Sequence, residues 1–319
     1  MSKIALSARL FATSQLFLPF WLTIETTTRC NLRCKTCIGP GEKGEDMSFG
    51  LFKSIIDQFK HTRLSSRKID LTGLGEPLLN PKLLSMVEYA KRRDFEVSFV
   101  SNFTTMSQET ATDLIKAKLD HLYVSIDAGS RETFEKIRAG ADFETVTDNV
   151  RLFVKTRKDQ NTDVPKLLFR STISKYNVGE STALIRLAET LGVDGIVFFP
   201  QLVPGNEYYS DLFVPPSRKD TILAVVENSM PSPDRTLICR SYSQCYITFD
   251  GKVLPCPILT QMMPRGQYSR VQFGNITENP FVKIWFSTRY RKFRARGALG
   301  RAYMFLCKYC PYSSGAKQS

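Results

Sequence analysis

The stretch TTTRCNLRCKTCIGPG, residues 26–41, places three cysteines within eight positions, at Cys30, Cys34 and Cys37. Three thiols cannot all pair with one another as disulfides, and they are one ligand short of a closed structural zinc site. Because a 4Fe–4S cube takes one ligand per iron, three cysteines would leave one iron with an open coordination position. The spacing therefore predicts a metal site that something other than a protein side chain completes.

The whole chain has the composition of a soluble globular protein, with 42% hydrophobic and 24% charged residues among 319. No apolar run is long enough to predict a transmembrane helix. The eight cysteines are unevenly distributed, with three at 30–37, none at 38–238 and five at 239–310. This distribution predicts two separate thiol sites in a reducing compartment, so we expect a cytoplasmic protein.

The segment before the first cysteines is apolar from residue 10 to residue 24 and follows Lys3 and Arg9. It runs directly into the cysteine cluster without a small-residue cleavage site, which argues against a signal peptide. We expect a helix over residues 4–16, which either covers the core or lies on a membrane surface.

Strand and helix patterns then alternate along the chain. Polar or reactive residues follow several of the predicted strands, and in a parallel sheet such residues meet at one edge. Right-handed crossovers would wind these units into a parallel sheet, either open or curled into part of a barrel. The predicted strands are 21–25, 67–73, 95–102, 121–127, 166–172 and 194–200, and the predicted helices are 47–60, 81–93, 107–117, 130–138, 142–158 and 179–192.

The spacing Cys30-x3-Cys34-x2-Cys37 resembles the signature of the radical S-adenosylmethionine (SAM) enzymes. The resemblance covers roughly residues 20–312 and implies a partial (β/α)6 TIM-like barrel. It also implies that SAM binds the open iron through its amino and carboxylate groups. An electron from the cluster would then cleave SAM to methionine and a 5′-deoxyadenosyl radical, which abstracts hydrogen from a substrate.

Three further segments carry the same resemblance. LTGLGEPLLNP (71–81) resembles the family's Gly-Glu-Pro motif, in which Gly75 and Glu76 would bind the amino group of SAM. FVSNFTT (99–105) and YVSIDAGSRETFEKIRAG (123–140) resemble the segments after the third and at the fourth strand. They imply SAM contacts for Asn102, Ser125 and Asp127.

Two arginines, Arg138 and Arg170, are candidates for the carboxylate of SAM, although either fits a surface salt bridge equally well. Thr36 departs from the family, many of whose members have an aromatic residue just before the third cysteine.

The second cysteine group follows a proline-rich connecting region at 201–235. Within this group, the segment QCYITFDGKVLPC (244–256) predicts a hairpin turning at Asp250-Gly251. Cys239-x11-Gly251-x4-Cys256 resembles the opening of the SPASM extension of some radical SAM enzymes. No cysteine occurs in the nine residues after Cys310, so the resemblance implies the shorter twitch form, a small α+β domain with one auxiliary 4Fe–4S cluster.

The expected ligands of that cluster are Cys256, Cys307 and Cys310, with Cys239 or Cys245 as the fourth; the five thiols also fit a zinc ribbon. The predicted organisation is an N-terminal helical extension (1–18), a radical SAM partial barrel (19–215) and the auxiliary-cluster domain (216–319).

The net charge is +13, and nine positive charges but no acidic residue follow Glu278. Such a segment would attract an acidic peptide, a phosphate-bearing substrate or nucleic acid. Alternatively it is a solvated helix face, because Val282, Trp285, Phe286 and Phe293 are spaced along one side of a helix over 281–296. The basic residues are Lys283, Arg289, Arg291, Lys292, Arg294, Arg296, Arg301, Lys308 and Lys317.

The resemblance implies an enzyme that carries out oxidation or bond formation on a peptide or small metabolite, with flavodoxin or ferredoxin as reductant. Candidate acid, base or radical-relay residues are Tyr208, Asp250 and Cys245. One alternative is a radical SAM methyltransferase. A second is a zinc-stabilised protein that binds nucleic acid or peptide through its basic C-terminal segment.

Overall fold

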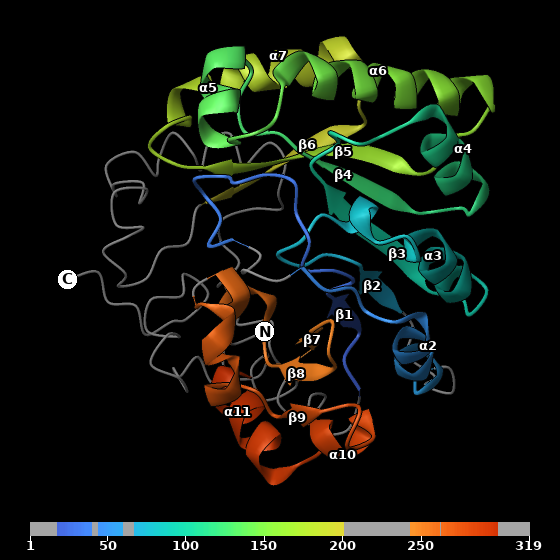
Figure 1. The fold of residues 1–319 in the computed structure, drawn as a ribbon, viewed down its shortest axis with the longest axis vertical. Coiled ribbons are helices and arrows are strands. Elements are labelled where there is room, and N and C mark those ends of the chain that lie inside the picture. The colour runs from blue at the N-terminus through green and yellow to red at the C-terminus, as the bar shows by residue number, and fades with distance from the viewer. Residues whose placement is uncertain (1–17, 40–43, 60–66, 201–242, 262, 299–319) are drawn as a thin grey trace, which may run out of the picture.

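The computed structural model describes residues 18–39, 44–59, 67–200, 243–261 and 263–298. These residues form one curved sheet, shown in Figure 1. From one edge to the other, its strands are β6 (Gly195–Pro200), β5 (Lys166–Ile173), β4 (His121–Ser125), β3 (Glu96–Ser101), β2 (Lys68–Asp70), β1 (Trp21–Ile24), β7 (Gln244–Ile247), β8 (Lys252–Leu254) and β9 (Gly274–Asn275).

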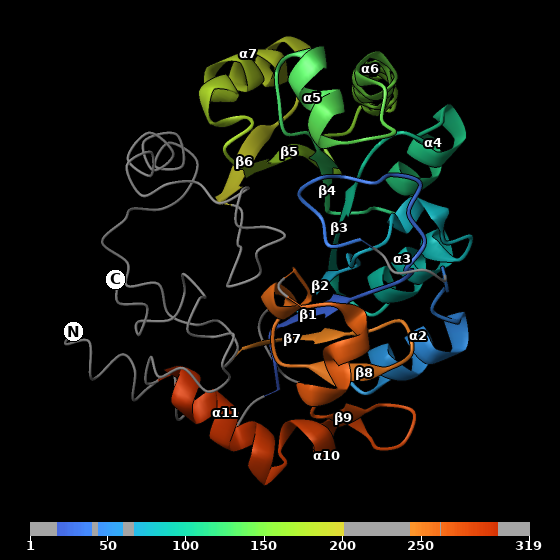
Figure 2. The ribbon, with the colours of Figure 1, turned by 60° about the vertical axis from the view of Figure 1, so that its left-hand side comes forward.

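Six of these strands alternate with helices along the chain, as the sequence predicts, and neighbouring strands from β6 to β1 are parallel. The helices lie on the outer, convex side of the sheet (Figures 1 and 2). This arrangement confirms the expected partial TIM-like barrel. The helices are α2 (Phe49–Asp57), α3 (Leu83–Lys91), α4 (Gln108–Lys116), α5 (Arg131–Ile137), α6 (Phe143–Asp159) and α7 (Ser181–Leu191).

The helices begin where short polar side chains cap them. Ser48 precedes α2 and its side chain accepts a hydrogen bond from the amide of Leu51, as the sequence predicts. Ser107 and Asp142 cap α4 and α6 in the same way. The strands alternate between fully buried residues, which pack into the core with the helices, and half-buried residues on the concave face.

The hairpin predicted around Asp250-Gly251 forms, and Gly251 has the positive φ of 86° that this turn needs. The sequence does not indicate where the hairpin attaches. Its first strand, β7, pairs in parallel with β1, so the sheet continues from the barrel into the C-terminal part of the chain. Two 3-10 segments, η5 (Pro257–Gln261) and η6 (Arg265–Arg270), follow the hairpin.

The prediction of a single helix over 281–296 is wrong. The structure contains two helices, α10 (Phe281–Trp285) and α11 (Thr288–Ala298), with a break at Phe286 and Ser287. Trp285 of α10 and Phe293 of α11 are buried, while Val282 of α10 is exposed.

No helix in the described part of the chain is long and apolar enough to cross a membrane. The helix expected over 4–16 lies outside the described residues.

Candidate functional site

The loop that carries the three cysteines leaves the carboxyl end of β1 and is fastened on two sides. On one side, the amide of Met47 donates to the carbonyl of Thr26 and the amide of Thr28 donates to the carbonyl of Glu45. On the other side, two amides of the loop donate to the backbone at the end of α5, Arg33 to Ala139 and Lys35 to Ile137. These bonds fix the loop across the ends of the strands, where Figure 2 shows it.

Cys30, Cys34 and Cys37 are free thiols of intermediate exposure. Burial raises the pKa of the Cys34 thiol to about 11, and the nearby Arg138 opposes that shift. Within the described residues, no three His, Cys, Asp or Glu side chains are arranged to hold a single metal ion. A 4Fe–4S cube does not need that convergence, because each iron takes its own thiolate. The donor set and the opposing arginine therefore fit an anionic cluster better than one zinc ion.

Gly75 and Glu76 follow β2 and lie directly against the cysteine loop. A Cβ atom at Gly75 would come within 2.3 Å of the carbonyl oxygen of Thr27 and 2.8 Å of that of Arg29. The amide of Glu76 donates to the carbonyl of Arg29 at 2.7 Å. The sequence separates these segments by more than forty residues, but the structure brings them into backbone contact. Only glycine permits that approach.

The carboxylate of Glu76 is only 3% exposed. It accepts hydrogen bonds from the amides of Leu78 at 3.2 Å and Asn102 at 2.6 Å. Burial raises the pKa of Glu76 to about 7, although these amides lower it. A cation bound at this carboxylate would hold it in its charged form. The site is thus suited to an ammonium group, which agrees with the amino group of SAM.

Asn102 lies beside Glu76, but its side chain fastens the cysteine loop. Its Nδ2 donates to Oδ1 of Asn31 at 2.8 Å, and its Oδ1 accepts from Oγ1 of Thr104 at 2.7 Å. Asn31 in turn donates to Thr104 at 2.7 Å. Its predicted role as a SAM contact stays a prediction, and the structure adds this second role that the sequence did not indicate.

Ser125 ends β4, and the buried Asp127 follows two residues later. Oδ2 of Asp127 lies 2.8 Å from Nη2 of Arg138, and Oδ1 accepts from the amide of Thr172 at 2.7 Å. The side chain of Arg138 is only 11% exposed, so the alternative of a surface salt bridge is wrong for this residue.

The guanidinium of Arg138 lies within electrostatic range of two of the thiols, Cys34 and Cys37. Burial alone would lower the pKa of Arg138, but Asp127, Cys34 and Cys37 raise it above its ordinary value. Its Nε is buried without a hydrogen-bond partner among the described residues. A buried, unpaired donor beside the cysteine loop fits a bound carboxylate such as that of SAM. The ion pair with Asp127 holds the guanidinium of Arg138 in place.

The remaining candidates lie elsewhere. Arg170 stands on β5, with its guanidinium carbon 4.4 Å from the centre of the Phe199 ring. Asp250 accepts a hydrogen bond from Thr248 and pairs with Lys252 within the hairpin, so its carboxylate serves the turn. Tyr208 lies outside the described residues.

Two of the five C-terminal cysteines are described. Cys245 is fully buried in β7, where desolvation raises the pKa of its thiol well above the ordinary value. Cys256 follows β8 and is half-buried, and its sulfur accepts a hydrogen bond from the amide of Ile258 at 3.3 Å. Cys239, Cys307 and Cys310 lie outside the described residues.

The sequence analysis missed an ion pair next to this site. Glu25 directly follows β1, and Arg265 of η6 binds both of its carboxylate oxygens, at 2.5 and 2.9 Å. The buried hydroxyls of Tyr246 and Tyr268 complete this cluster, and that of Tyr246 interacts with the carboxylate of Glu25. A carboxylate placed immediately after an apolar strand was the one available signal, but its partner lies far away in the sequence.

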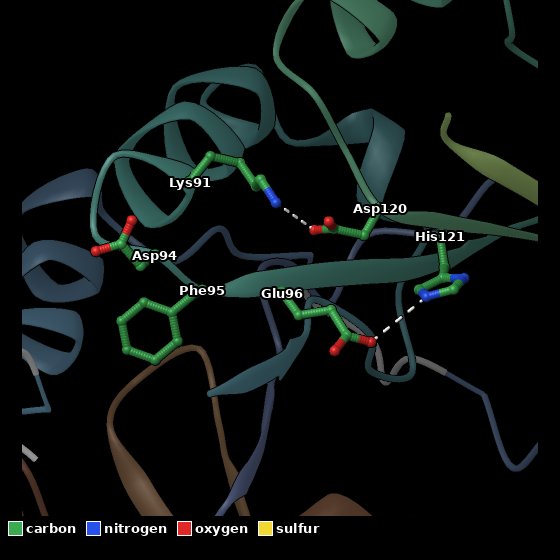
Figure 3. A pocket seen from close by; sticks show the side chains of 6 residues that line it. All are labelled: Lys91, Asp94, Phe95, Glu96, Asp120 and His121. Carbon is green, nitrogen blue, oxygen red and sulfur yellow. Dashed lines mark hydrogen bonds and ion pairs between the residues drawn. The ribbon is translucent and has the colours of Figure 1, made fainter. Parts of the chain in front are cut away.

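An open pocket of about 600 Å³ lies at the other end of the strands, where β3 and β4 begin (Figure 3). Two ion pairs line it, Lys91 with Asp120 at 2.5 Å and His121 with Glu96 at 3.4 Å. The cysteine loop and Glu76 follow the carboxyl ends of strands, so this pocket is separate from the site described above.

Comparison with protein families and curated proteins agrees with this geometry. The model of the radical SAM superfamily matches residues 24–199, and that of the SPASM iron–sulfur cluster-binding domain matches residues 239–311. A tungsten-containing aldehyde ferredoxin oxidoreductase cofactor-modifying protein of Pyrococcus furiosus is 27% identical, over 86% of this chain and 83% of its own. An AdoMet-dependent heme synthase of Methanosarcina barkeri is 25% identical, over 94% of this chain and 91% of its own.

Solved structures share the fold at lower sequence identity. Streptococcus suis SuiB bound to S-adenosylmethionine superimposes with a TM-score of 0.70 at 14% identity, over 96% of this chain and 73% of SuiB. Native anSMEcpe with bound AdoMet gives a TM-score of 0.68 at 15% identity, over 92% of this chain and 87% of its own. The superfamily match spans more than half of the chain, and its boundaries enclose the cysteine loop, Glu76 and Arg138. This protein therefore belongs to the radical SAM superfamily and is an enzyme with a SPASM iron–sulfur domain.

Proposed function

We propose that this enzyme cleaves SAM reductively at a 4Fe–4S cluster held by Cys30, Cys34 and Cys37, and that it then abstracts hydrogen from a substrate. The observation that carries the proposal is the backbone contact between Gly75-Glu76 and the cysteine loop. That contact puts a buried carboxylate beside three thiols, as the binding of one amino acid-like ligand on a cluster requires. When bound, the cluster and SAM supply the electron transfer and the 5′-deoxyadenosyl radical.

The residues of this chain would bind and orient SAM. Glu76 would accept hydrogen bonds from the amino group, because its buried carboxylate is stabilised by a positive partner. Arg138 would bind the carboxylate through its unpaired Nε, while Asp127 keeps the guanidinium in position. Asn102, which follows β3, and Ser125, at the end of β4, would contact the same ligand.

We also propose one auxiliary 4Fe–4S cluster, bound by Cys239, Cys256, Cys307 and Cys310. The complete burial of Cys245 among apolar side chains of the core supports Cys239 as the fourth ligand. Basic side chains of α11 offer a surface for an acidic reductant such as flavodoxin or ferredoxin, and for an acidic or phosphate-bearing substrate.

The proposed reaction is an oxidation or a bond formation on a small metabolite or a peptide. The names of the two curated relatives refer to modification of a cofactor and synthesis of heme, which supports a small molecule. Structures of SuiB with a precursor peptide and of anSMEcpe with a peptide support the second substrate class.

The test uses anaerobic, cluster-loaded protein with SAM and dithionite, followed by chromatography of the nucleosides. We expect 5′-deoxyadenosine from the wild type and none from the C30A/C34A/C37A variant. Formation of S-adenosylhomocysteine would instead support the methyltransferase alternative. A colourless, zinc-containing wild type that leaves SAM intact would contradict the proposal and support a binding protein.

A further inference from the structure

The concave face of the sheet carries a polar group that the proposed SAM site does not use. It consists of Asp70 on β2, Ser98 on β3, Tyr123 on β4 and Arg170 on β5. These residues alternate along their strands with fully buried residues that pack in the core with the helices, so their side chains lie on the inner side of the barrel.

Arg170 is half-buried on β5, next to the edge strand β6. In the register of the sheet it lies between Ser125 of β4 and Val197 of β6. Its guanidinium carbon lies 4.4 Å from the centre of the Phe199 ring, which supports one face of the cation. No ion pair or hydrogen bond joins this guanidinium to any other described residue, so its N–H donors remain free among them.

Asp70 is an acidic residue within electrostatic range of Arg170, and one oxygen of its carboxylate already accepts hydrogen bonds. Its Oδ1 accepts hydrogen bonds from Oγ1 of Thr72 at 2.7 Å and from Oγ of Ser98 at 3.4 Å. It is close enough to Arg170 to interact electrostatically, yet no ion pair within 4 Å forms. Asp70 therefore balances the charge of Arg170 without using its hydrogen-bond donors.

Tyr123 provides a second free donor. It is half-buried, its ring stacks beside His121 with centroids 6.4 Å apart, and it lies within electrostatic range of both Asp70 and Arg170. Its hydroxyl has no hydrogen-bond partner among the described residues. A planar cation and a phenol hydroxyl on one face form a recognition site for an oxyanion.

We propose that Arg170, supported by Phe199 and assisted by Tyr123, binds a carboxylate of the substrate. This inference rests on the proposed function and names a substrate class for it. A carboxylate fits better than a phosphate, because one guanidinium partly balanced by Asp70 matches a single negative charge. Arg138, beside the thiols, is left to bind the carboxylate of SAM. The second candidate of the sequence analysis, Arg170, thus becomes a specificity-determining residue for the substrate.

The test probes Arg170 chemically in the anaerobic, cluster-loaded protein saturated with SAM. Phenylglyoxal modifies accessible arginines, and peptide mass spectrometry gives the modification rate of Arg170 and Arg138 separately. Benzoate serves as the carboxylate probe, benzamide as its uncharged analogue and inorganic phosphate as the competing oxyanion. Tyr123→Phe is the matched variant, since it removes one half-buried hydroxyl and keeps the ring.

We expect SAM to protect Arg138 and to leave Arg170 reactive. Benzoate should slow modification of Arg170 by about tenfold, as expected when a charge-assisted hydrogen-bond pair forms, and benzamide should not. In Y123F the benzoate concentration needed for half-protection should rise severalfold, while the Kd of SAM from equilibrium dialysis stays constant.

Three results would overturn the inference: protection of Arg170 by SAM alone, equal protection by benzoate and benzamide, or better protection by phosphate than by benzoate. None of them depends on SAM cleavage. Absence of 5′-deoxyadenosine would refute the proposed function, whereas these results would refute the role of Arg170 alone.

Discussion

Arg265 binds both carboxylate oxygens of Glu25 across 240 residues of sequence. The carboxylate is fully buried at the end of β1, and the amides of Leu74 and Phe249 approach it at 3.4 Å. Such a charge is costly to bury unless a partner neutralises it. The segment after the hairpin therefore stabilises the strand from which the cysteine loop begins.

Replacing Arg265 with Met should lower the free energy of unfolding by about 3–5 kcal/mol, because it leaves Glu25 charged and unpaired in the core. Denaturant titration of the cluster-loaded protein measures this change. Arg131→Met is the control, since its ion pairs with Glu135 and Glu144 are exposed and a loss of about 1 kcal/mol or less is expected. Equal losses in the two variants would contradict the interpretation of the buried pair.

Replacing Gly75 with Ala should weaken SAM binding by about tenfold or more, because the new methyl group would meet the carbonyl of Thr27 at 2.3 Å. Equilibrium dialysis of SAM measures the effect, and iron analysis checks that the cluster is loaded. Gly179→Ala is matched to it, because nothing lies within 4 Å of a Cβ there, and its affinity for SAM should equal that of the wild type. Unchanged affinity in G75A would refute the proposed role of the contact.

Replacing Arg138 with Gln should lower the affinity for SAM by about ten- to a hundredfold, the loss expected for a charge-assisted hydrogen bond. Asp127→Asn separates binding from positioning, because it breaks the same ion pair but keeps the guanidinium. The dialysis experiment should therefore find a smaller loss in D127N than in R138Q. If both variants lose the same affinity, Arg138 only supports the fold.

The buried carboxylate of Asp70 should make the stability of the folded protein depend on pH. Burial raises its pKa above the ordinary value of 3.8. Between pH 3.8 and the folded-state pKa, the folded protein therefore holds a proton that the unfolded chain releases. Stability from this group is therefore greatest below 3.8 and falls as the pH rises toward the folded-state pKa. Asp70→Asn removes the penalty and should raise the Tm at pH 7–8 relative to the wild type, with the difference shrinking as the pH falls toward 3.8.

Asp142→Asn is the control for this prediction. Hydrogen bonds from Thr145 lower the pKa of this exposed capping carboxylate, so it contributes stability above 3.8 that is lost as the pH falls. Scanning calorimetry should find no gain in Tm at pH 7–8 for D142N. A gain of equal size in both variants would mean that burial of Asp70 is not its cause.

The sequence predicted the strands, the helices and a helix cap well, and also which residues meet at the carboxyl edge of the sheet. The six strands β1–β6 and their helices follow from alternating patterns and caps, and Ser48 caps α2 as expected. Gly75-Glu76 meets the cysteine loop because the carboxyl ends of parallel strands share one edge of the sheet.

Contacts between residues far apart in the sequence could not be predicted in this way. Nothing in the hairpin sequence indicates that β7 pairs with β1, or that Arg265 is the partner of Glu25. The use of Asn102 to fasten Asn31 was missed because its motif suggested a ligand instead. The break between α10 and α11 was missed because no proline or glycine marks it.

The pairing of β7 with β1 has a consequence for biosynthesis. β1 ends at residue 24 and β7 begins at residue 244, so about 220 further residues are made before β1 gains that neighbour. At typical ribosomal speeds this interval lasts on the order of ten to forty seconds. Throughout it, β1 is an open edge of the nascent sheet, and the charge of Glu25 at its end discourages other chains from adding to that edge. The carboxylate that Arg265 later neutralises thus first protects the newly made chain from association.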